Sequence, residues 1–195
     1  HHSVEDLSWL RALPGLDIIV PADRAETRQA LRRSARDPRP TFIRIGRTPV
    51  PDVTCPDDRL RRGRFTQLRD GSDATIIAVG VAVARALRAA AELADEGVGV
   101  RVLNAAYVAP LDTQAIIGAA SQTHAIVVAE EANLAGGLGA AVASVVSQLG
   151  RAARVPMRLL GLAEFAPTGS SEFLLDYFGL TAAKMRSAVL EALLG

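Results

Sequence analysis

Residues 73–112 read DATIIAVGVAVARALRAAAELADEGVGVRVLNAAYVAPLD and alternate between the patterns of strands and helices. Residues 74–79 form an apolar run with the length of a buried strand, and residues 99–103 form another. The segment between them predicts a helix with an apolar stripe formed by Val83, Leu87, Ala90 and Ala94. Asp112 is a favourable first residue for a further helix, which we expect to reach about residue 121.

The same alternation continues to the C-terminus. Residues 125–129 and 157–160 are short apolar runs predicted as strands. One face of the predicted helix between them is lined by Leu138, Ala141, Val142, Val145, Val146 and Leu149. Thr181 predicts the start of a closing helix through Leu194. Strands that alternate with helices pair in parallel, so the expected fold class is α/β, with a largely parallel sheet covered by helices on both faces.

The first part of the chain has a related pattern with shorter elements. Ser3 with Asp6 predicts a capped helix that carries Val4, Leu7 and Leu10 and stops at Pro14-Gly15. A strand is predicted at residues 17–20 and another at residues 41–45. Asp23 with Glu26 predicts the start of the helix between them, whose apolar side is formed by Ala30, Leu31 and Ala35. This order is typical of the end of an α/β domain, and its abrupt beginning suggests a piece of something larger.

Three divisions of the chain follow from these patterns. Residues 1–48 are predicted to end a first domain, and residues 74–195 to form a complete second domain. Residues 49–73 contain three prolines and are predicted as a linker that leads to an edge strand near residues 65–68. The linker also carries Arg59, Arg61, Arg62 and Arg64. We interpret this run as a solvated crossing segment packed on a neighbouring domain, in preference to a phosphate or nucleic-acid patch, because no aromatic residues interleave for stacking.

Composition narrows the classes of function. The formal net charge of +1 gives no reason to expect nucleic-acid or membrane binding. No apolar run approaches the roughly 20 residues that span a bilayer, and the N-terminus lacks a signal-peptide pattern. The single cysteine, Cys55, cannot form an internal disulfide, which favours a cytoplasmic location.

Few residues are free-standing candidates for chemistry. Gly136-Gly137-Leu138-Gly139 at a helix start could hold a phosphate, but it follows two glutamates, so a packing role is preferred. His124 is interpreted as a structural histidine. His1 and His2 have three interpretations: a purification-tag remnant, chance, or an anion-binding imidazole beside Arg47, whose guanidinium suits phosphate.

Several blocks together resemble the transketolase family, especially the C-terminal subunit of its split, two-gene forms. The first is HHSVEDLSWLRALPGLDIIVPAD followed by PTFIRIGR, which resembles the end of the pyrimidine-binding domain. DATIIAVGVAVARALRAAAELADEGVGVRVLNAAYVAPLD, IVVAEEANLAGGLGAAVA and DYFGLTAAKM resemble the transketolase C-terminal domain from its first strand to its last helix. The resemblance covers nearly the whole chain. It implies the end of a pyrimidine-binding α/β domain followed by a complete C-terminal α/β sandwich.

The resemblance also implies a function. This family transfers a two-carbon ketol unit between sugar phosphates, in carbohydrate and pentose phosphate metabolism, and it uses thiamine diphosphate with Mg²⁺. Carried over by position, the family's contacts to the substrate phosphate fall on His1 and Arg47, which argues against a tag. No Gly-Asp-Gly cofactor motif is found in this chain, and the activating glutamate lies upstream of the histidine motif. We therefore expect the cofactor and metal to be bound mainly outside this chain, and no catalytic residue is assigned within it.

The implied partners are an N-terminal thiamine-diphosphate-binding subunit or domain and a sugar phosphate, in a homodimer or heterotetramer. The chain alone is expected to be inactive. Two alternatives use the same cofactor: 1-deoxyxylulose-5-phosphate synthase and the beta subunit of 2-oxoacid dehydrogenases. An alternative of another class is a non-catalytic subunit-interaction module, because the second domain has no convergent titratable cluster.

Overall fold

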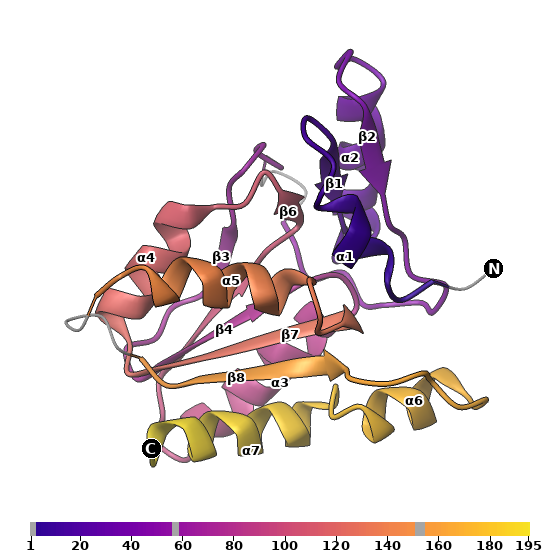
Figure 1. The fold of residues 1–195 in the computed structure, drawn as a ribbon. Helices are drawn as coiled ribbons and strands as arrows, with labels where there is room; N and C mark the ends of the chain where they lie inside the picture. Colours follow the sequence, from indigo (N-terminus) through magenta and orange to yellow (C-terminus); the bar gives the residue numbers. More distant parts are fainter. Residues whose placement is uncertain (1–2, 56–58, 151–154) are drawn as a thin grey trace.

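A computed structural model describes residues 3–55, 59–150 and 155–195. It contains two sheets, and the larger one forms the centre of the molecule (Figure 1). The order of its strands is β3-β5-β4-β7-β8. Their bounds are Thr66–Arg69 (β3), Ala74–Ala78 (β4), Val100–Asn104 (β5), Ala125–Asn133 (β7) and Met157–Leu162 (β8). All neighbours pair in parallel except β3, which is antiparallel to β5 at the edge.

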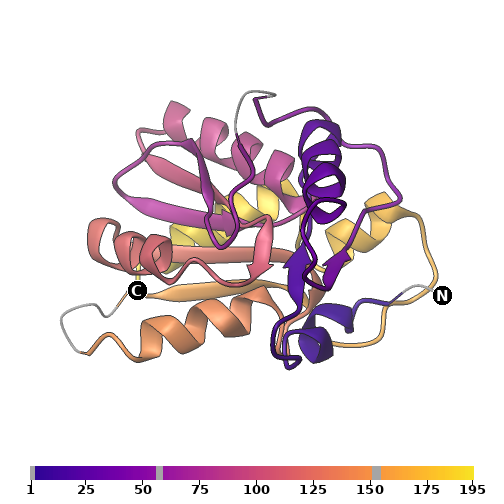
Figure 2. The same cartoon turned by 90° about the horizontal axis from the view of Figure 1, so that it is seen from above.

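Helices cover both faces of this sheet, as the view from above shows (Figure 2). One face carries α3 (Ala82–Asp95) and α7 (Ala182–Leu193), which pack on each other and on the strands. The opposite face carries α4 (Thr113–Gln122) and α5 (Leu138–Ser147). The short α6 (Ser171–Tyr177) lies between β8 and α7 in the chain. The predicted α/β class and largely parallel sheet are confirmed.

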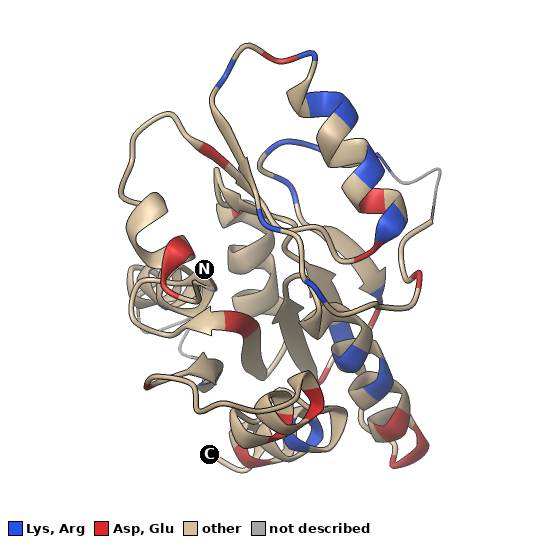
Figure 3. Cartoon of the chain, turned by 90° about the vertical axis from the view of Figure 1, so that its right-hand side faces the viewer, with Lys and Arg blue, Asp and Glu red and all other residues tan. Residues whose placement is uncertain are grey.

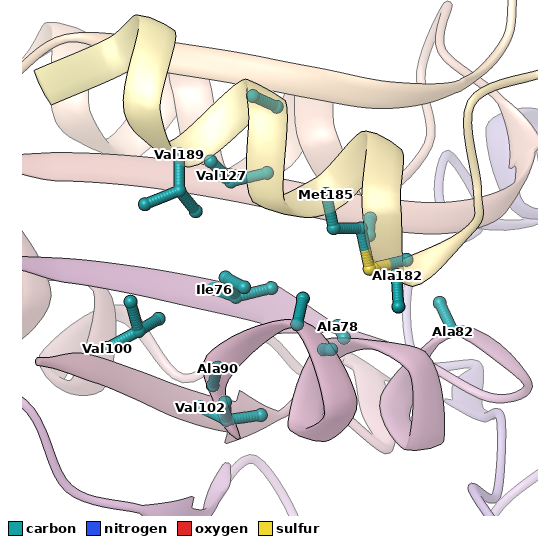
Figure 4. Close-up of a cluster of buried hydrophobic side chains, with 14 of the residues drawn as sticks. Ile76, Ala78, Ala82, Ala90, Val100, Val102, Val127, Ala182, Met185 and Val189 are labelled. Carbon is teal, nitrogen blue, oxygen red and sulfur yellow. The ribbon is translucent and has the colours of Figure 1, made fainter. Parts of the chain in front are cut away.

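The interior between β4, β5, α3 and α7 is built from small and β-branched side chains (Figure 4). Ile76, Val100 and Val127 come from three adjacent strands, and Met185 and Val189 project from α7 toward them. Alanines at the helix contacts, which have no bulk beyond Cβ, let the helix backbones approach the sheet closely. The five larger side chains named above are fully buried, so this layer contributes apolar burial that stabilises the fold.

The smaller sheet has the order β2-β1-β6. Strand β1 (Asp17–Ile19) pairs in parallel with β2 (Thr41–Ile43) and in antiparallel with β6 (Tyr107–Ala109). The helices of this part are α1 (Asp6–Leu10) and α2 (Arg24–Ser34). Because β6 follows β5 in the chain, the larger part donates a strand to the smaller sheet. The two parts of the chain are therefore joined through backbone hydrogen bonds as well as side chains.

Most predicted helix starts are found, and one is wrong. Asp23, Asp112 and Thr181 each accept a hydrogen bond from the backbone of the first helical turn. Ser3 does not cap α1, because the helix begins only at Asp6 and the hydroxyl instead donates to Glu5. Ser3 is thus too far upstream to reach the first turn.

Two predicted apolar faces differ from those observed. On α2, Ala30 is buried, but Leu31 is 51% exposed and Ala35 is exposed as well. The reason is that α2 buries the charged side chain of Glu26 beside Ala30, so its inner face is partly polar. On α3, Ala94 is exposed, and the inner face continues through Leu93.

Two elements, β6 and α6, were not predicted. The four arginines of the linker are exposed, as predicted for a solvated segment, and two of them also bind carboxylates of neighbouring elements. Arg62 makes a paired interaction with Asp17 of β1, with nitrogen–oxygen distances of 2.7 and 2.8 Å. Arg64 lies 3.4 Å from Asp112. These contacts fasten the crossing segment to both parts of the molecule. None of the helices in the described ranges is both long and apolar enough to cross a bilayer.

Candidate functional site

Arg47 follows β2 in a loop that borders an open hollow of about 280 Å³. The other residues that line the hollow are Pro21, Ala22, Asp23, Arg24, Thr27, Ile45, Gly46, Thr48, Pro49, Val50 and Val81. Arg47 is exposed, and within the described ranges no ion pair involves it. Its guanidinium is therefore available to an anion in this hollow. His1, the other predicted phosphate-binding residue, lies outside the described residues.

Asp23 forms one wall of the hollow and fixes its shape. Besides capping α2, its buried carboxylate accepts hydrogen bonds from the backbone of Val53 and Thr54 at 2.8 and 2.6 Å, and from the Thr54 hydroxyl. Burial by itself would raise the pKa of Asp23, but these hydrogen bonds to the charged form outweigh burial and lower the pKa. The ionised carboxylate thus holds the segment at Val53 and Thr54 against the start of α2.

Glu26, in the first turn of α2, connects the same corner to the larger sheet. It is 3% exposed and accepts a hydrogen bond from the backbone of Ala22 at 2.7 Å. The amide nitrogen of Asn104, at the end of β5, lies 3.0 and 3.1 Å from its two carboxylate oxygens. A buried carboxylate is tolerated when it accepts several hydrogen bonds. Glu26 therefore fixes α2 relative to the second domain.

Arg44 stands three residues before Arg47 and has a different environment. Its Nε lies 3.0 Å from Asp6 of α1, and its terminal nitrogen lies 3.7 Å from Glu131 of β7. Burial raises the pKa of Glu131, while the charges of Arg44 and Arg85 lower it. Arg44 is thus neutralised between two carboxylates and links α1, the end of β2 and the end of β7.

The loop that carries Arg47 is also held from the C-terminal side. The hydroxyl of Thr48 donates to the hydroxyl of Ser171, the first residue of α6, at 3.0 Å. The unpredicted helix α6 therefore contributes to the position of the loop. The segment that follows His2 is fixed as well, because the backbone of Asn133 donates to the carbonyl of Val4 at 2.7 Å.

The glycine-rich turn before α5 is occupied by a side chain of the protein. Glu130, fully buried, accepts hydrogen bonds at 2.7 Å from the backbone of Leu138 and of Gly139. Burial raises the pKa of Glu130, although these two bonds and the charge of Arg11 oppose the rise. Because a carboxylate already fills this helix N-terminus, the preferred packing interpretation of residues 136–139 is supported over phosphate binding.

The described residues do not fit a Mg²⁺-diphosphate centre. In residues 3–55, 59–150 and 155–195, no three His, Cys, Asp or Glu side chains come together in a way that would hold a metal ion. The carboxylates near Arg47 are instead engaged by backbone groups and arginines. We therefore assign no metal-binding role to the described residues around Arg47.

Two protein families match the sequence of this chain. The family described as "Transketolase, C-terminal domain" matches residues 63–185, and "Transketolase, pyrimidine binding domain" matches residues 1–52. The chain belongs to the transketolase family. Enzymes of this family are thiamine-diphosphate-dependent, and the resemblance seen in the sequence is confirmed.

Relatives and a solved structure agree with this assignment. The 6-deoxy-6-sulfo-D-fructose transketolase subunit SqwH of Clostridium sp. (strain MSTE9) is 39% identical over 192 residues, which are 98% of this chain and 59% of the relative. The 1-deoxy-D-xylulose-5-phosphate synthase of Pelotomaculum thermopropionicum is 34% identical over 98% of this chain and 30% of that enzyme. A solved "Split gene transketolase, inactive beta4 tetramer" is 40% identical, with a TM-score of 0.94 over all of this chain and 63% of that one.

The chain matches only part of the length of its relatives. The chain spans about three-fifths of the length of the transketolase subunit SqwH and less of the synthase. Of the two predicted phosphate-binding residues, His1 and Arg47, only Arg47 falls in the described ranges. Sequence reasoning missed Asp6, Arg44 and Glu131, although Arg44 contacts the other two across separations of 38 and 87 residues in the chain. No spacing rule connects residues at such separations, although a charge placed at the end of a buried strand was a weak signal.

Proposed function

We propose that the chain is the C-terminal part of a transketolase-like enzyme that transfers a two-carbon ketol unit between sugar phosphates. Thiamine diphosphate with Mg²⁺ would be bound mainly outside this chain, and the chain would be inactive without the missing upstream and cofactor-binding parts. The similarity to a transketolase subunit over 98% of the chain supports this proposal. The cofactor supplies the chemistry that breaks and forms the carbon–carbon bond, and the protein supplies binding and orientation.

The observation that carries the substrate assignment is the contrast between Arg44 and Arg47. Arg44 is neutralised by Asp6 and Glu131, whereas Arg47 is exposed at the hollow with no ion pair in the described ranges. A planar guanidinium that is always charged binds a phosphate group with two parallel hydrogen bonds. In this proposal Arg47 binds the phosphate end of the sugar, and His1 is the second contact, as the family resemblance implies.

The proposed assembly includes an N-terminal subunit or domain that binds the cofactor. A homodimer or heterotetramer would bring that part against the face that carries Arg47. The solved split-gene relative is described as an inactive β4 tetramer, which supports the idea that C-terminal subunits of this kind associate with one another without the cofactor-binding part. A cytoplasmic location fits the single cysteine and the sugar phosphate substrate.

The test uses the enzyme reconstituted with its cofactor-binding part. Arg47→Ala should raise KM for phosphorylated acceptors by about tenfold or more, because a charge-assisted hydrogen bond contributes about 1.5–3 kcal/mol. KM for the matching unphosphorylated sugars should change much less. Arg28→Ala removes the same charge from an exposed position of α2 that does not line the hollow, and it should leave both values unchanged. Equal effects of Arg47→Ala on both classes of acceptor would refute the assignment.

A second candidate function is 1-deoxyxylulose-5-phosphate synthesis, because such synthases match 98% of this chain at 34% identity. The two reactions differ in the donor, which is a ketose phosphate for transketolase and pyruvate for the synthase. Assaying the reconstituted enzyme with each donor and an aldose phosphate acceptor separates them. Turnover of pyruvate but not of ketose phosphates would favour the synthase. The absence of turnover with any donor, together with stable complex formation, would favour a non-catalytic interaction module.

A further inference from the structure

Arginines gather beside the C-terminal half of α2, away from the hollow that contains Arg47. Figure 3 shows basic residues along this helix and along the loop beside it. A hollow of about 410 Å³ lies here, lined by Gln29, Arg32, Arg33, Arg36, Asp37, Arg59 and Leu60. A second one of about 380 Å³ shares Arg59 and is lined further by Arg61, Arg64, Phe65, Thr66 and Gln67. We call the two together the arginine groove. It combines side chains from α2 and from the linker, which are far apart in the sequence.

Among the described residues, few carboxylates compensate the positive charge of the arginine groove. In the described ranges, Arg32, Arg33, Arg36, Arg59 and Arg61 take part in no ion pair. The one carboxylate in the lining belongs to Asp37 and is bound by Arg39. Like charges that converge on one concave surface raise the local potential, and the low dielectric of the protein beneath them strengthens it. An anion bound here would relieve that repulsion.

Arg33 is positioned by a contact with the ring of Tyr107. Its guanidinium carbon lies 5.9 Å from the centre of the Tyr107 ring, and Tyr107 is itself fully buried. The Nε atom of Arg33 is buried and has no hydrogen-bond partner. An arginine held against an aromatic ring loses less conformational entropy when it binds an anion. The free energy of binding is therefore more favourable than for a freely rotating side chain.

We propose that the arginine groove binds a small polyphosphate anion, with two or three linked phosphate groups, either free or as the phosphate chain of a nucleotide. Several guanidinium groups at one concave site match several adjacent phosphates, since each arginine can bind phosphate through two parallel hydrogen bonds. A nucleic acid fits less well, because the lining offers no exposed aromatic ring for base stacking: Phe65 packs into the core. A single sugar phosphate would leave most of this charge unpaired.

The test is calorimetric titration of the 195-residue chain with sodium tripolyphosphate at fixed ionic strength. We expect a saturable single-site isotherm. Arg36→Gln and Arg59→Gln, made singly because one lies on α2 and the other in the linker, should each weaken binding by about tenfold, as expected for loss of a charge-assisted contact. Arg28→Gln removes the same charge from the same helix outside the groove and should change affinity less than about twofold. Circular dichroism checks that each variant is folded.

Two further titrations identify the ligand. Equal affinity for ATP and tripolyphosphate would mean that the phosphate chain alone is recognised, whereas tighter binding of ATP would mean that the nucleoside contributes; either result supports the proposal. Arg47→Ala should leave tripolyphosphate binding unchanged, because Arg47 does not line the arginine groove. A negative result for the arginine groove would therefore leave the proposed transferase function untouched. The proposal is overturned by a lack of saturable binding, by an equal loss in Arg28→Gln, or by tighter binding of a single-stranded RNA oligomer than of tripolyphosphate at equal phosphate concentration.

Discussion

Arg44 and Arg47 follow the same strand and differ in what surrounds each guanidinium. Only 15% of the Arg44 side chain is exposed, and it lies between Asp6 and Glu131. A charge so far removed from water must be paired, and breaking the pair leaves uncompensated charges behind. Arg47 is exposed and free to bind a ligand. Two identical side chains thus differ in environment: Arg44 is paired within the fold, and Arg47 is exposed.

Arg44→Met should destabilise the protein by about 2 kcal/mol, because it removes a charge-assisted hydrogen bond from Asp6 and leaves Glu131 with less compensation. Burial already raises the pKa of Glu131, and loss of Arg44 raises it further. A carboxyl whose pKa is raised in the folded state contributes stability at low pH that is lost as the pH rises through that pKa. The gap between wild type and variant in urea unfolding should thus be larger at pH 7 than at pH 4.5.

A matched control is available on α3. Arg88 pairs with Glu92 at 3.0 Å, but the Arg88 side chain is 76% exposed. Arg88→Met should therefore change the free energy of unfolding by less than about 0.5 kcal/mol at either pH. If both variants lost the same small amount, the structural role assigned to Arg44 would be wrong.

At the scale of elements, the turn from β7 into α5 depends on glycines because Glu130 folds back over it. A Cβ on Gly137 would lie 2.2 Å from a carboxylate oxygen of Glu130 and 2.7 Å from the carbonyl oxygen of Asn133. Glu130 is held by two hydrogen bonds to the α5 backbone. The carbonyl of Asn133 belongs to the backbone at the end of β7. The glycine is thus required by close approach of other atoms.

Gly137→Ala should cost about 2 kcal/mol or more of stability, because Glu130 must move and give up its hydrogen bonds to the start of α5. Gly118 is the control, since it lies within α4 and an added Cβ there would meet nothing within 4 Å. Gly118→Ala should stabilise the protein by about 0.5–1 kcal/mol through helix propensity. Chemical denaturation of the two variants measures both effects, and a neutral Gly137→Ala would contradict the packing described here.

Elements with a strong pattern were predictable from the sequence, and those made by tertiary contacts were not. The strands at residues 74–79 and 125–129 and the caps Asp23, Asp112 and Thr181 follow local rules, and the structure has them. Strand β6 exists because Ile18 and Ile19 offer it an edge from about 90 residues away in the chain, and such pairing leaves no local signal. The exposed position of Leu31 likewise depends on Glu26 being buried on the inner face of α2.

The candidate site was less predictable than the fold. Arg47 was predicted through the family resemblance and stays a prediction, since a lone arginine after a strand has no distinctive spacing. Asp6, Arg44 and Glu131 were not found, because their contact joins three elements that only the folded chain brings together. The linker arginines show the same limit: Arg62 finds its partner in Asp17, 45 residues away, while Arg59 has none in the described ranges. Spacing cannot distinguish these two cases.

At the scale of the whole molecule, the two parts of the chain are connected at several separate points. Strand β6 pairs with β1, Arg62 joins the linker to Asp17, and Arg11 of the first part donates to the carbonyl of Gly137 at 2.9 Å. Asn104 binds Glu26 from the larger sheet. Residues that form contacts across a boundary make the unfolding of one side depend on the other. Opening the smaller part alone would therefore break several of these links.

This connectivity predicts a single cooperative unfolding transition for the 195-residue chain. Trp9, the sole tryptophan, lies in α1 and reports on the smaller part, while far-ultraviolet circular dichroism is dominated by the helices of the larger part. The two probes should give coincident urea midpoints, which is the standard criterion for two-state behaviour. Asp17→Ala removes the partner of Arg62 and should lower both midpoints together, because the loss is shared by one cooperative unit. A fluorescence transition at clearly lower urea than the dichroism transition would show instead that the smaller part unfolds by itself.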